Sequence, residues 1–181
     1  MKKILIIIPR YDYTEKSNFE YAFPLGLAYI SSVLKKAKYD VTCLNLNHYT
    51  GTIKNLIYET LDKNKFEVVC TGHVGRGYHI VKSIVNAIRS HNSNPLIILG
   101  GILVSTEPKL MFEMLKPDFI IVGEGENAIL NLLKCIEDKG NLETVEGIGF
   151  SKDNNIIITK SLVPVQDLDS LPLPDFEGFE Y

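Results

Sequence analysis

The chain has 181 residues, of which 45% are hydrophobic and 23% are charged, so it can bury a substantial core and is not disordered. This length allows one α/β domain with a short appendage rather than two full domains. Nineteen lysines and arginines oppose 22 aspartates and glutamates, and the resulting formal net charge of −3 argues against a nucleic-acid-binding domain, which normally carries a basic surplus.

Short runs rich in isoleucine, valine and leucine alternate along the chain with longer segments of helical period. This alternation predicts an open, doubly wound parallel sheet with helices on both faces. A helix is expected to begin near Pro24, and the last helix is expected over residues 124–138. The five predicted strands are Lys3–Ile8, Asp40–Leu46, Glu67–Thr71, Leu96–Leu99 and Phe119–Val122.

The pattern changes after residue 142. Two extended stretches, Gly147–Ser151 and Ile156–Thr159, flank four polar residues and predict a β-hairpin. The proline spacing of Leu171–Phe176 is typical of an extended linker, although a tail docked on the domain is the alternative. We therefore expect an α/β domain over residues 1–142, followed by a hairpin and linker over residues 143–181 that lead towards a further domain.

The three cysteines, Cys43, Cys70 and Cys135, are odd in number and widely spaced. They form neither a disulfide framework nor a cysteine-rich metal motif, which predicts a reducing environment. The apolar run at residues 4–8 is too short for a signal peptide, and no stretch reaches the roughly 18 to 20 apolar residues of a membrane span. A cytoplasmic location without membrane contact is expected.

Ligands of doubly wound sheets bind beyond the carboxyl ends of the strands. Glycines gather in the loops at this edge, where they let a bulky group approach the backbone, although tight turns would explain any one of them. The sequence has no phosphate loop of the Gly-x-x-x-x-Gly-Lys-Ser/Thr type. It also lacks the dinucleotide-binding fingerprint Gly-x-Gly-x-x-Gly, because the glycines at 72, 75 and 77 have a different spacing. The candidate binding residues are Arg10, Tyr11, Gly72, His73, Val74, Gly75, Gly100, Gly101, Gly123, Glu124, Gly125 and Glu126.

Four side chains near this edge could carry chemistry. His73 is the most suggestive, because imidazole is both a metal ligand and a proton donor near neutral pH, but a lone loop histidine more often only forms hydrogen bonds. Glu124 and Glu126 could act as acid and base, yet their place at a helix start favours capping. Cys70 ends an apolar run, which favours a buried and inert thiol.

Several motifs follow one another in a fixed order: Pro24–Ile30, Ile-Leu-Gly-Gly at 98–101, Pro-Asp at 117–118 leading to Gly-Glu-Gly-Glu at 123–126, Gly-Ile-Gly-Phe at 147–150, and residues 167–174. In this order they resemble the N-terminal cobalamin-binding domain of cobalamin-dependent radical SAM enzymes. The similarity covers nearly the whole chain, and the combination of motifs is specific although no single motif is.

This resemblance implies a flavodoxin-like (Rossmann-like) sheet whose carboxyl edge holds cobalamin. It also implies a C-terminal radical SAM domain beyond the linker, with S-adenosylmethionine (SAM) and a 4Fe-4S cluster on a Cys-x-x-x-Cys-x-x-Cys motif. This chain lacks that motif and cannot cleave SAM by itself, so whether it is an enzyme stays open. The parent reaction expected from the family is methyl transfer or anaerobic oxidative ring closure.

The chain departs from related patterns at three places: the loop after the first strand, Gly72-His73-Val74 where the family has Ser-x-Leu, and Ile102 where Pro-His is frequent after Gly-Gly. Cobalamin domains of the methionine-synthase type carry Asp-x-His-x-x-Gly after the first strand, and this loop has no histidine. His73 follows the third strand instead; hydrogen bonding is the role expected of it, and cobalt ligation is the alternative. Two alternatives to cobalamin binding also remain: a cofactor-free scaffold or sensor domain, and a flavodoxin-like FMN-binding module.

Overall fold

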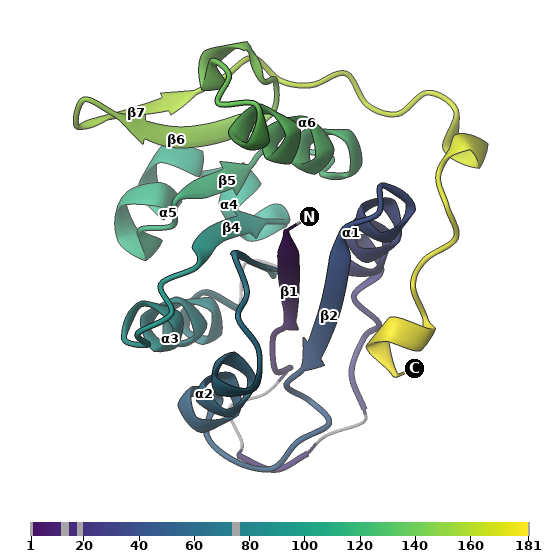
Figure 1. The fold of residues 1–181 in the computed structure, drawn as a ribbon, viewed down its shortest axis with the longest axis vertical. Helices are drawn as coiled ribbons and strands as arrows, with labels where there is room; N and C mark the ends of the chain where they lie inside the picture. The colour runs from purple at the N-terminus through teal and green to yellow at the C-terminus, as the bar shows by residue number, and fades with distance from the viewer. Residues whose placement is uncertain (1, 12–14, 18–19, 74–76, 181) are drawn as a thin grey trace.

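The structure is a computed structural model that describes residues 2–11, 15–17, 20–73 and 77–180. Seven strands form one sheet in the order β2-β1-β3-β4-β5-β6-β7 (Figure 1). The first five run parallel, and β6 and β7 are antiparallel to their neighbours. The strands are β1 (Lys3–Ile8), β2 (Asp40–Asn45), β3 (Val68–Gly72), β4 (Leu96–Gly100), β5 (Phe119–Ile121), β6 (Ile148–Lys152) and β7 (Asn155–Ile158).

Helices cover both faces of the sheet. One face packs against α1 (Leu25–Lys36) and α6 (Glu126–Glu137). The other face packs against α2 (Ile53–Lys63), α3 (Tyr78–Arg89), α4 (Ile102–Thr106) and α5 (Pro108–Leu115). The described helices are too short and too polar to cross a membrane.

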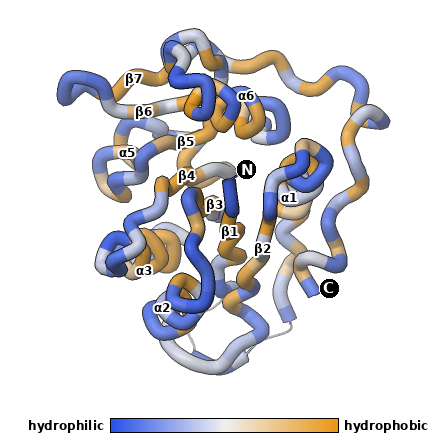
Figure 2. The backbone as a smooth tube through the Cα atoms, viewed as in Figure 1, coloured by the Kyte–Doolittle hydropathy of each residue, from blue (hydrophilic) through white to orange (hydrophobic). Residues whose placement is uncertain are grey.

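The alternation of side chains along β1 shows how the sequence builds these two layers. Ile4, Ile6 and Ile8 point to α1 and α6, whereas Leu5 and Ile7 point to the opposite helices, and all five are buried. Burying each such side chain stabilises the fold by about 1.5–3 kcal/mol. Figure 2 accordingly shows hydrophobic residues along the central strands and hydrophilic residues at the turn between β6 and β7.

The predicted five-stranded, doubly wound parallel sheet is confirmed, but in the described residues the sheet has seven strands. The predicted hairpin joins it, because β6 pairs with β5 and Ile148 lies opposite Ile121. Only Asp153 and Asn154 separate β6 from β7, with φ of 50° and 62°. Two successive residues of positive φ make the tight turn that suits the twist of paired strands. The division of the chain at residue 142 stays a prediction.

The strand order determines where a ligand can bind. β2 lies on one side of β1, and β3 to β5 follow on the other, so the direction of winding reverses between β1 and β3. Loops that leave the carboxyl ends of two such strands diverge to opposite faces of the sheet, which opens a crevice between them.

The C-terminal segment, residues 159–180, follows the outside of the domain to the end of β2 (Figure 1). It includes the short 3-10 turns η3 (Leu168–Ser170) and η4 (Glu177–Phe179). Phe179 is fully buried against the α1 side of the sheet, and the Asp175 N–H donates to the Ala28 carbonyl at 3.2 Å. The part of this segment around Asp175 and Phe179 is therefore packed on the domain, and a linker that leads towards a further domain stays a prediction.

Asp175 holds this segment on α1. Its carboxylate accepts hydrogen bonds from the Ser31 hydroxyl, the Lys35 ammonium and the Gly178 N–H. Burial by itself would raise the pKa of Asp175, but these hydrogen bonds and the charge of Lys35 outweigh burial, so the pKa lies below its usual value. The ionised carboxylate is thus the form that stabilises docking.

Replacing Asp175 with asparagine is expected to lower the free energy of unfolding by about 1 kcal/mol at pH 7. Because the folded-state pKa of Asp175 is depressed, its contribution is complete above the unfolded value near 3.9 and is lost as pH falls through the folded value. Urea unfolding from pH 7 to pH 3 should therefore show the two proteins converging. The Asp169→Asn variant, at an exposed carboxylate, controls for the change in charge, and a constant gap at all pH values would contradict the prediction.

Candidate ligand-binding cavity

A cavity of about 490 Å³ opens at the carboxyl ends of β1, β3, β4 and β5, on the face covered by α1 and α6. Its position matches the crevice expected where the winding reverses. Most of its wall is apolar. The lining residues are 8, 9, 11, 21–27, 30, 47, 70–73, 98, 100–102, 121, 123–126 and 129.

The glycines at this edge have different physical roles. Gly72 is required by packing, since a β-carbon there would overlap the carbonyl oxygen of Gly100 on the neighbouring strand. Gly101 is required by conformation, because its φ is +86° and side chains strain that region. Gly100 is required by neither, because the closest atom to an added β-carbon is the Ile121 Cβ at 3.9 Å. The absence of a side chain at Gly100 serves mainly to keep the cavity open.

Arg10 is a structural residue rather than a lining residue. Its side chain is 2% exposed, and it donates to the carbonyl oxygens of Leu46 at 3.0 Å, Gly51 at 2.9 Å and Tyr49 at 2.7 Å. The guanidinium therefore holds the loop after β2. Arg10 was expected at the binding edge because it follows β1, but its side chain points to the loop after β2 and is not among the residues that line the cavity.

Tyr11, the next residue, lies in the cavity wall and is half exposed. Its N–H donates to Asn47 Oδ1 at 2.7 Å. Asn47 also lines the cavity, and its Nδ2 donates to the Pro9 carbonyl at 3.0 Å. The loop that Arg10 holds thus positions one side of the cavity.

His73 lines the cavity, but its ring is turned towards the start of α3. A β-carbon added to Gly77 would overlap the imidazole, and the His73 carbonyl accepts the Leu103 N–H at 3.0 Å. Val74 and Gly75 lie outside the residues that the structure describes. Across the described ranges, no group of three or more metal-ligating side chains comes together.

The two glutamates of the Gly-Glu-Gly-Glu motif differ in their surroundings, although both line the cavity. Glu124 precedes α6, and its Oε2 accepts the Val165 N–H of the C-terminal segment at 2.9 Å. Glu126 lies in the first turn of α6, where a carboxylate suits the positive end of the helix dipole. Its Oε2 is buried, and no donor among the described residues reaches it.

Two glycines of this motif complete the edge of the cavity. Gly123 donates its N–H to Ser105 Oγ at 3.0 Å. Gly125 is the N-cap of α6, and a β-carbon there would lie 2.8 Å from Ile30 Cδ1. Gly125 therefore lets the loop after β5 pack closely against α1, and the Ser105 hydroxyl holds the same loop at Gly123.

Cys70 contributes its thiol to the cavity floor. Burial raises the pKa of Cys70 to about 12, so the thiol stays neutral at any physiological pH. The prediction of a buried, unreactive cysteine is confirmed. Cys70 is therefore not a nucleophile at this cavity.

Residues 21–27, at the end of the first loop and the start of α1, form a further wall of the cavity that the list of candidate binding residues did not include. Phe23 contributes an aromatic side chain to this wall and stacks on Phe176 of the C-terminal segment, with ring centroids 5.0 Å apart. Phe23 also meets Phe179 at 5.9 Å. The apolar residues just before Pro24 could have indicated this wall. They lie in a loop without helical or strand periodicity, so the sequence pattern did not show which way their side chains point.

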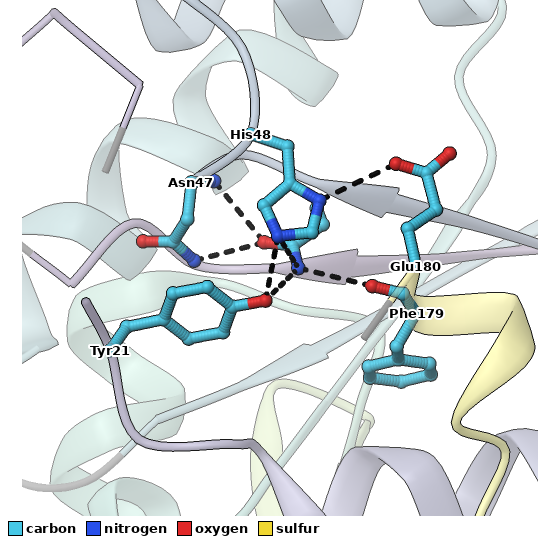
Figure 3. Close-up of polar contacts among 6 residues, drawn as sticks. Tyr21, Asn47, His48, Phe179 and Glu180 are labelled. Carbon is cyan, nitrogen blue, oxygen red and sulfur yellow. Dashed lines mark hydrogen bonds and ion pairs between the residues drawn. The ribbon is translucent and has the colours of Figure 1, made fainter. Parts of the chain in front are cut away.

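Tyr21 belongs to the same wall and joins a polar network (Figure 3). Asn45 Oδ1 accepts from the backbone and side-chain amides of Asn47, so Asn45 Nδ2 faces the Tyr21 hydroxyl at 2.6 Å. The Tyr21 hydroxyl also lies 2.8 Å from His48 Nε2. On the other side of the ring, His48 Nδ1 faces Glu180 Oε2 at 3.4 Å. This network connects the cavity wall to the C-terminal segment.

The family model described as a B12 binding domain matches residues 19–133. The chain belongs to this B12-binding domain family. The matched residues include β2 to β5, α1 to α5 and most of α6, and thus nearly all of the cavity wall.

Longer proteins contain a similar segment. The chain is 30% identical over 156 residues to the anaerobic magnesium-protoporphyrin IX monomethyl ester cyclase of Synechocystis, across 81% of this chain and 30% of the cyclase. It is 22% identical over 182 residues to the uncharacterized methyltransferase PH0819 of Pyrococcus horikoshii, across 98% of this chain and 38% of that protein. The chain thus spans about a third of the length of these relatives.

Solved structures share the fold. OxsB, a cobalamin-dependent S-adenosylmethionine radical enzyme solved with aqua-cobalamin, superposes with a TM-score of 0.79 at 20% identity, over 99% of this chain and 25% of OxsB. TsrM of Kitasatospora setae is a radical S-adenosylmethionine methyltransferase solved with cobalamin and a 4Fe-4S cluster. It superposes with a TM-score of 0.74 at 15% sequence identity, over 95% of this chain and 31% of TsrM. The predicted flavodoxin-like fold and cobalamin-domain family are confirmed, and the FMN and scaffold alternatives are not favoured.

Proposed function

We propose that this domain binds cobalamin at the cavity beyond β1, β3, β4 and β5 and presents it to a radical SAM domain. The observation that carries the proposal is an apolar cavity of about 490 Å³ at the reversal of winding, in a chain of the B12-binding family. This volume lies in the range of about 300–1,000 Å³ that is usual for small-molecule sites.

The residues at the cavity suit a large ligand with an apolar body and polar edges. Gly100 leaves an open path to the interior, and the side chains of Phe23 and Ile121 offer apolar contact. Glu126 supplies a hydrogen-bond acceptor that no donor from the described part of the chain reaches. The cavity would hold a portion of the cofactor, with Glu126 and the strand-end glycines beside it. When bound, cobalamin supplies cobalt chemistry that side chains cannot provide.

In this proposal His73 orders its loop and forms hydrogen bonds instead of ligating cobalt. Its ring packs against Gly77, and the first loop has no histidine to take the position used in domains of the methionine-synthase type. Arg10 supports the site from outside the cavity. The cobalamin contacts are assigned to Tyr11, Gly100, Gly101, Gly123 and Glu126.

Titration of the purified chain with hydroxocobalamin tests the proposal. The expected result is a corrinoid that stays with the protein through gel filtration, with visible bands shifted from those of the free compound. A parallel titration with FMN serves as the comparison, because a flavin module of the same fold would retain FMN. Retention of FMN alone, or of neither compound, would reject cobalamin binding.

The partner domain and the reaction belong to the same proposal. The relatives are about three times the length of the matched segment, and their names describe a cyclase and a methyltransferase. We assign the parent reaction to methyl transfer or anaerobic oxidative ring closure, with SAM and a 4Fe-4S cluster held by the C-terminal radical SAM domain. A cytoplasmic location fits this chemistry, since iron–sulfur clusters and free thiols such as Cys43 and Cys135 persist under reducing conditions.

A further inference from the structure

One residue of the cavity wall, Glu126, has a buried oxygen that no hydrogen bond from the described residues satisfies. Glu126 Oε2 is buried and accepts no hydrogen bond from any residue that the structure describes, and Glu126 lines the cavity. Burying a carboxylate oxygen without a donor costs free energy, because the oxygen loses its water and gains nothing in return. Such an atom is explained when a ligand brings the missing donor.

The neighbouring glutamate of the same motif, Glu124, does have a hydrogen-bond donor within the protein. Glu124 also lines the cavity, but its Oε2 accepts the Val165 N–H at 2.9 Å. The C-terminal segment thus supplies a donor to Glu124 and none to Glu126. The first turn of α6, a helix of 12 residues, favours negative charge at Glu126 without forming the missing hydrogen bond.

The charge of the cavity limits what the ligand group can be. Among its described lining residues are two carboxylates, Glu124 and Glu126, and no lysine or arginine. A phosphate or carboxylate group placed at Glu126 would meet like charge with no cation to offset it. The group that faces Glu126 is therefore a donor, with an N–H or O–H bond and no negative charge.

We propose that Glu126 selects the corrinoid by accepting a hydrogen bond from one of its carboxamide side chains. This inference rests on the proposed function. The edge of the corrin ring carries primary amides, which are uncharged N–H donors, and a bond from such a donor to a carboxylate is stronger than one between neutral groups. The ribose hydroxyl of the nucleotide tail is another donor of the same chemistry, and the experiment separates the two sources.

The test measures dissociation constants for three corrinoids by visible absorption: cobalamin, cobinamide, which lacks the nucleotide tail, and a cobalamin whose ring amides are hydrolysed to carboxylates. The Glu126→Gln variant is expected to bind cobalamin and cobinamide about 10- to 100-fold more weakly than the unchanged chain. The hydrolysed corrinoid should bind poorly to the unchanged chain and regain affinity in Glu126→Gln, because the carboxylate repulsion is gone. Glu113→Gln, the same change at an exposed position of α5, should leave all three constants unchanged.

A second measurement does not depend on the cofactor. Glu126→Met replaces the unpartnered carboxylate by an apolar side chain of similar length, so the melting temperature of the cofactor-free protein should rise by about 2–4 °C. A fall in melting temperature would show that Glu126 stabilises the fold and would overturn the inference.

The binding outcomes separate the inference from the proposed function. If the unchanged chain binds none of the corrinoids, the proposed function fails. If it binds cobalamin and Glu126→Gln binds equally well, only the inference about Glu126 fails. A loss of affinity confined to cobalamin, with cobinamide unaffected, would assign the donor to the nucleotide tail and overturn the carboxamide assignment.

Discussion

Replacing Gly100 with valine is expected to weaken hydroxocobalamin binding about 100-fold while the protein stays folded. Gly100 is the last residue of β4, and strand alternation places its missing side chain on the same face as Ile98, in the cavity wall. The nearest atom to an added β-carbon is 3.9 Å away, so the valine meets little protein and occupies space that the ligand needs. Corrinoid titration measures the loss, and urea unfolding checks the fold.

Two comparisons make the Gly100 result specific. Ser151→Val places the same side chain on an exposed position of β6, away from the cavity, and should leave the affinity unchanged. Gly101→Val would be less informative, because its φ of +86° adds backbone strain to any steric effect. A folded Gly100→Val protein with unchanged affinity would show that the end of β4 does not face the ligand.

Replacing Arg10 with methionine is expected to lower the free energy of unfolding by about 3–5 kcal/mol. The guanidinium is buried and donates to three carbonyl oxygens of the loop after β2, those of Leu46, Tyr49 and Gly51. Methionine fills much of the volume but leaves these oxygens without the donor. Urea unfolding measures the effect.

Corrinoid affinity should fall with stability in the Arg10 variant, because the loop also carries Asn47, which positions Tyr11 at the cavity. Arg89→Met is the matched control. Arg89 pairs with Asp118 at 2.8 Å on a partly exposed surface, where such pairs contribute less than about 1 kcal/mol. Equal losses in the two variants would contradict the structural role assigned to Arg10.

The position of each strand could be predicted because the information is local. Residues 4–8 are apolar on both sides of the strand, as is required of a strand that lies between two layers of helices. The glycines at the strand ends were equally visible, and Gly100 and Gly101 do line the cavity. Boundaries differed by one residue in most strands, since hydrogen bonding to a neighbour decides where a strand ends.

Side-chain direction at the binding edge could not be predicted in the same way. Arg10 and Tyr11 are adjacent in sequence, yet the buried Arg10 side chain hydrogen-bonds to the loop after β2, whereas Tyr11 lines the cavity. Glu124 and Glu126 share one motif, but only Glu124 meets the Val165 N–H, from a residue 41 positions later. In both pairs, the hydrogen-bond partner that makes the two residues differ lies far away in the sequence. The residues next to each pair therefore do not reveal how its two side chains differ.

The sequence by itself determined the elements of this protein: five buried strands, the helices between them, the hairpin and a glycine-rich edge, because hydrophobic period and turn residues act within a few positions. Only the tertiary structure decided that the hairpin extends the sheet beyond β5, that residues 21–27 wall the cavity, and that the C-terminal segment docks through Asp175 and Phe179. These features depend on contacts between distant segments, whose partners are chosen by packing and hydrogen bonding across the whole fold.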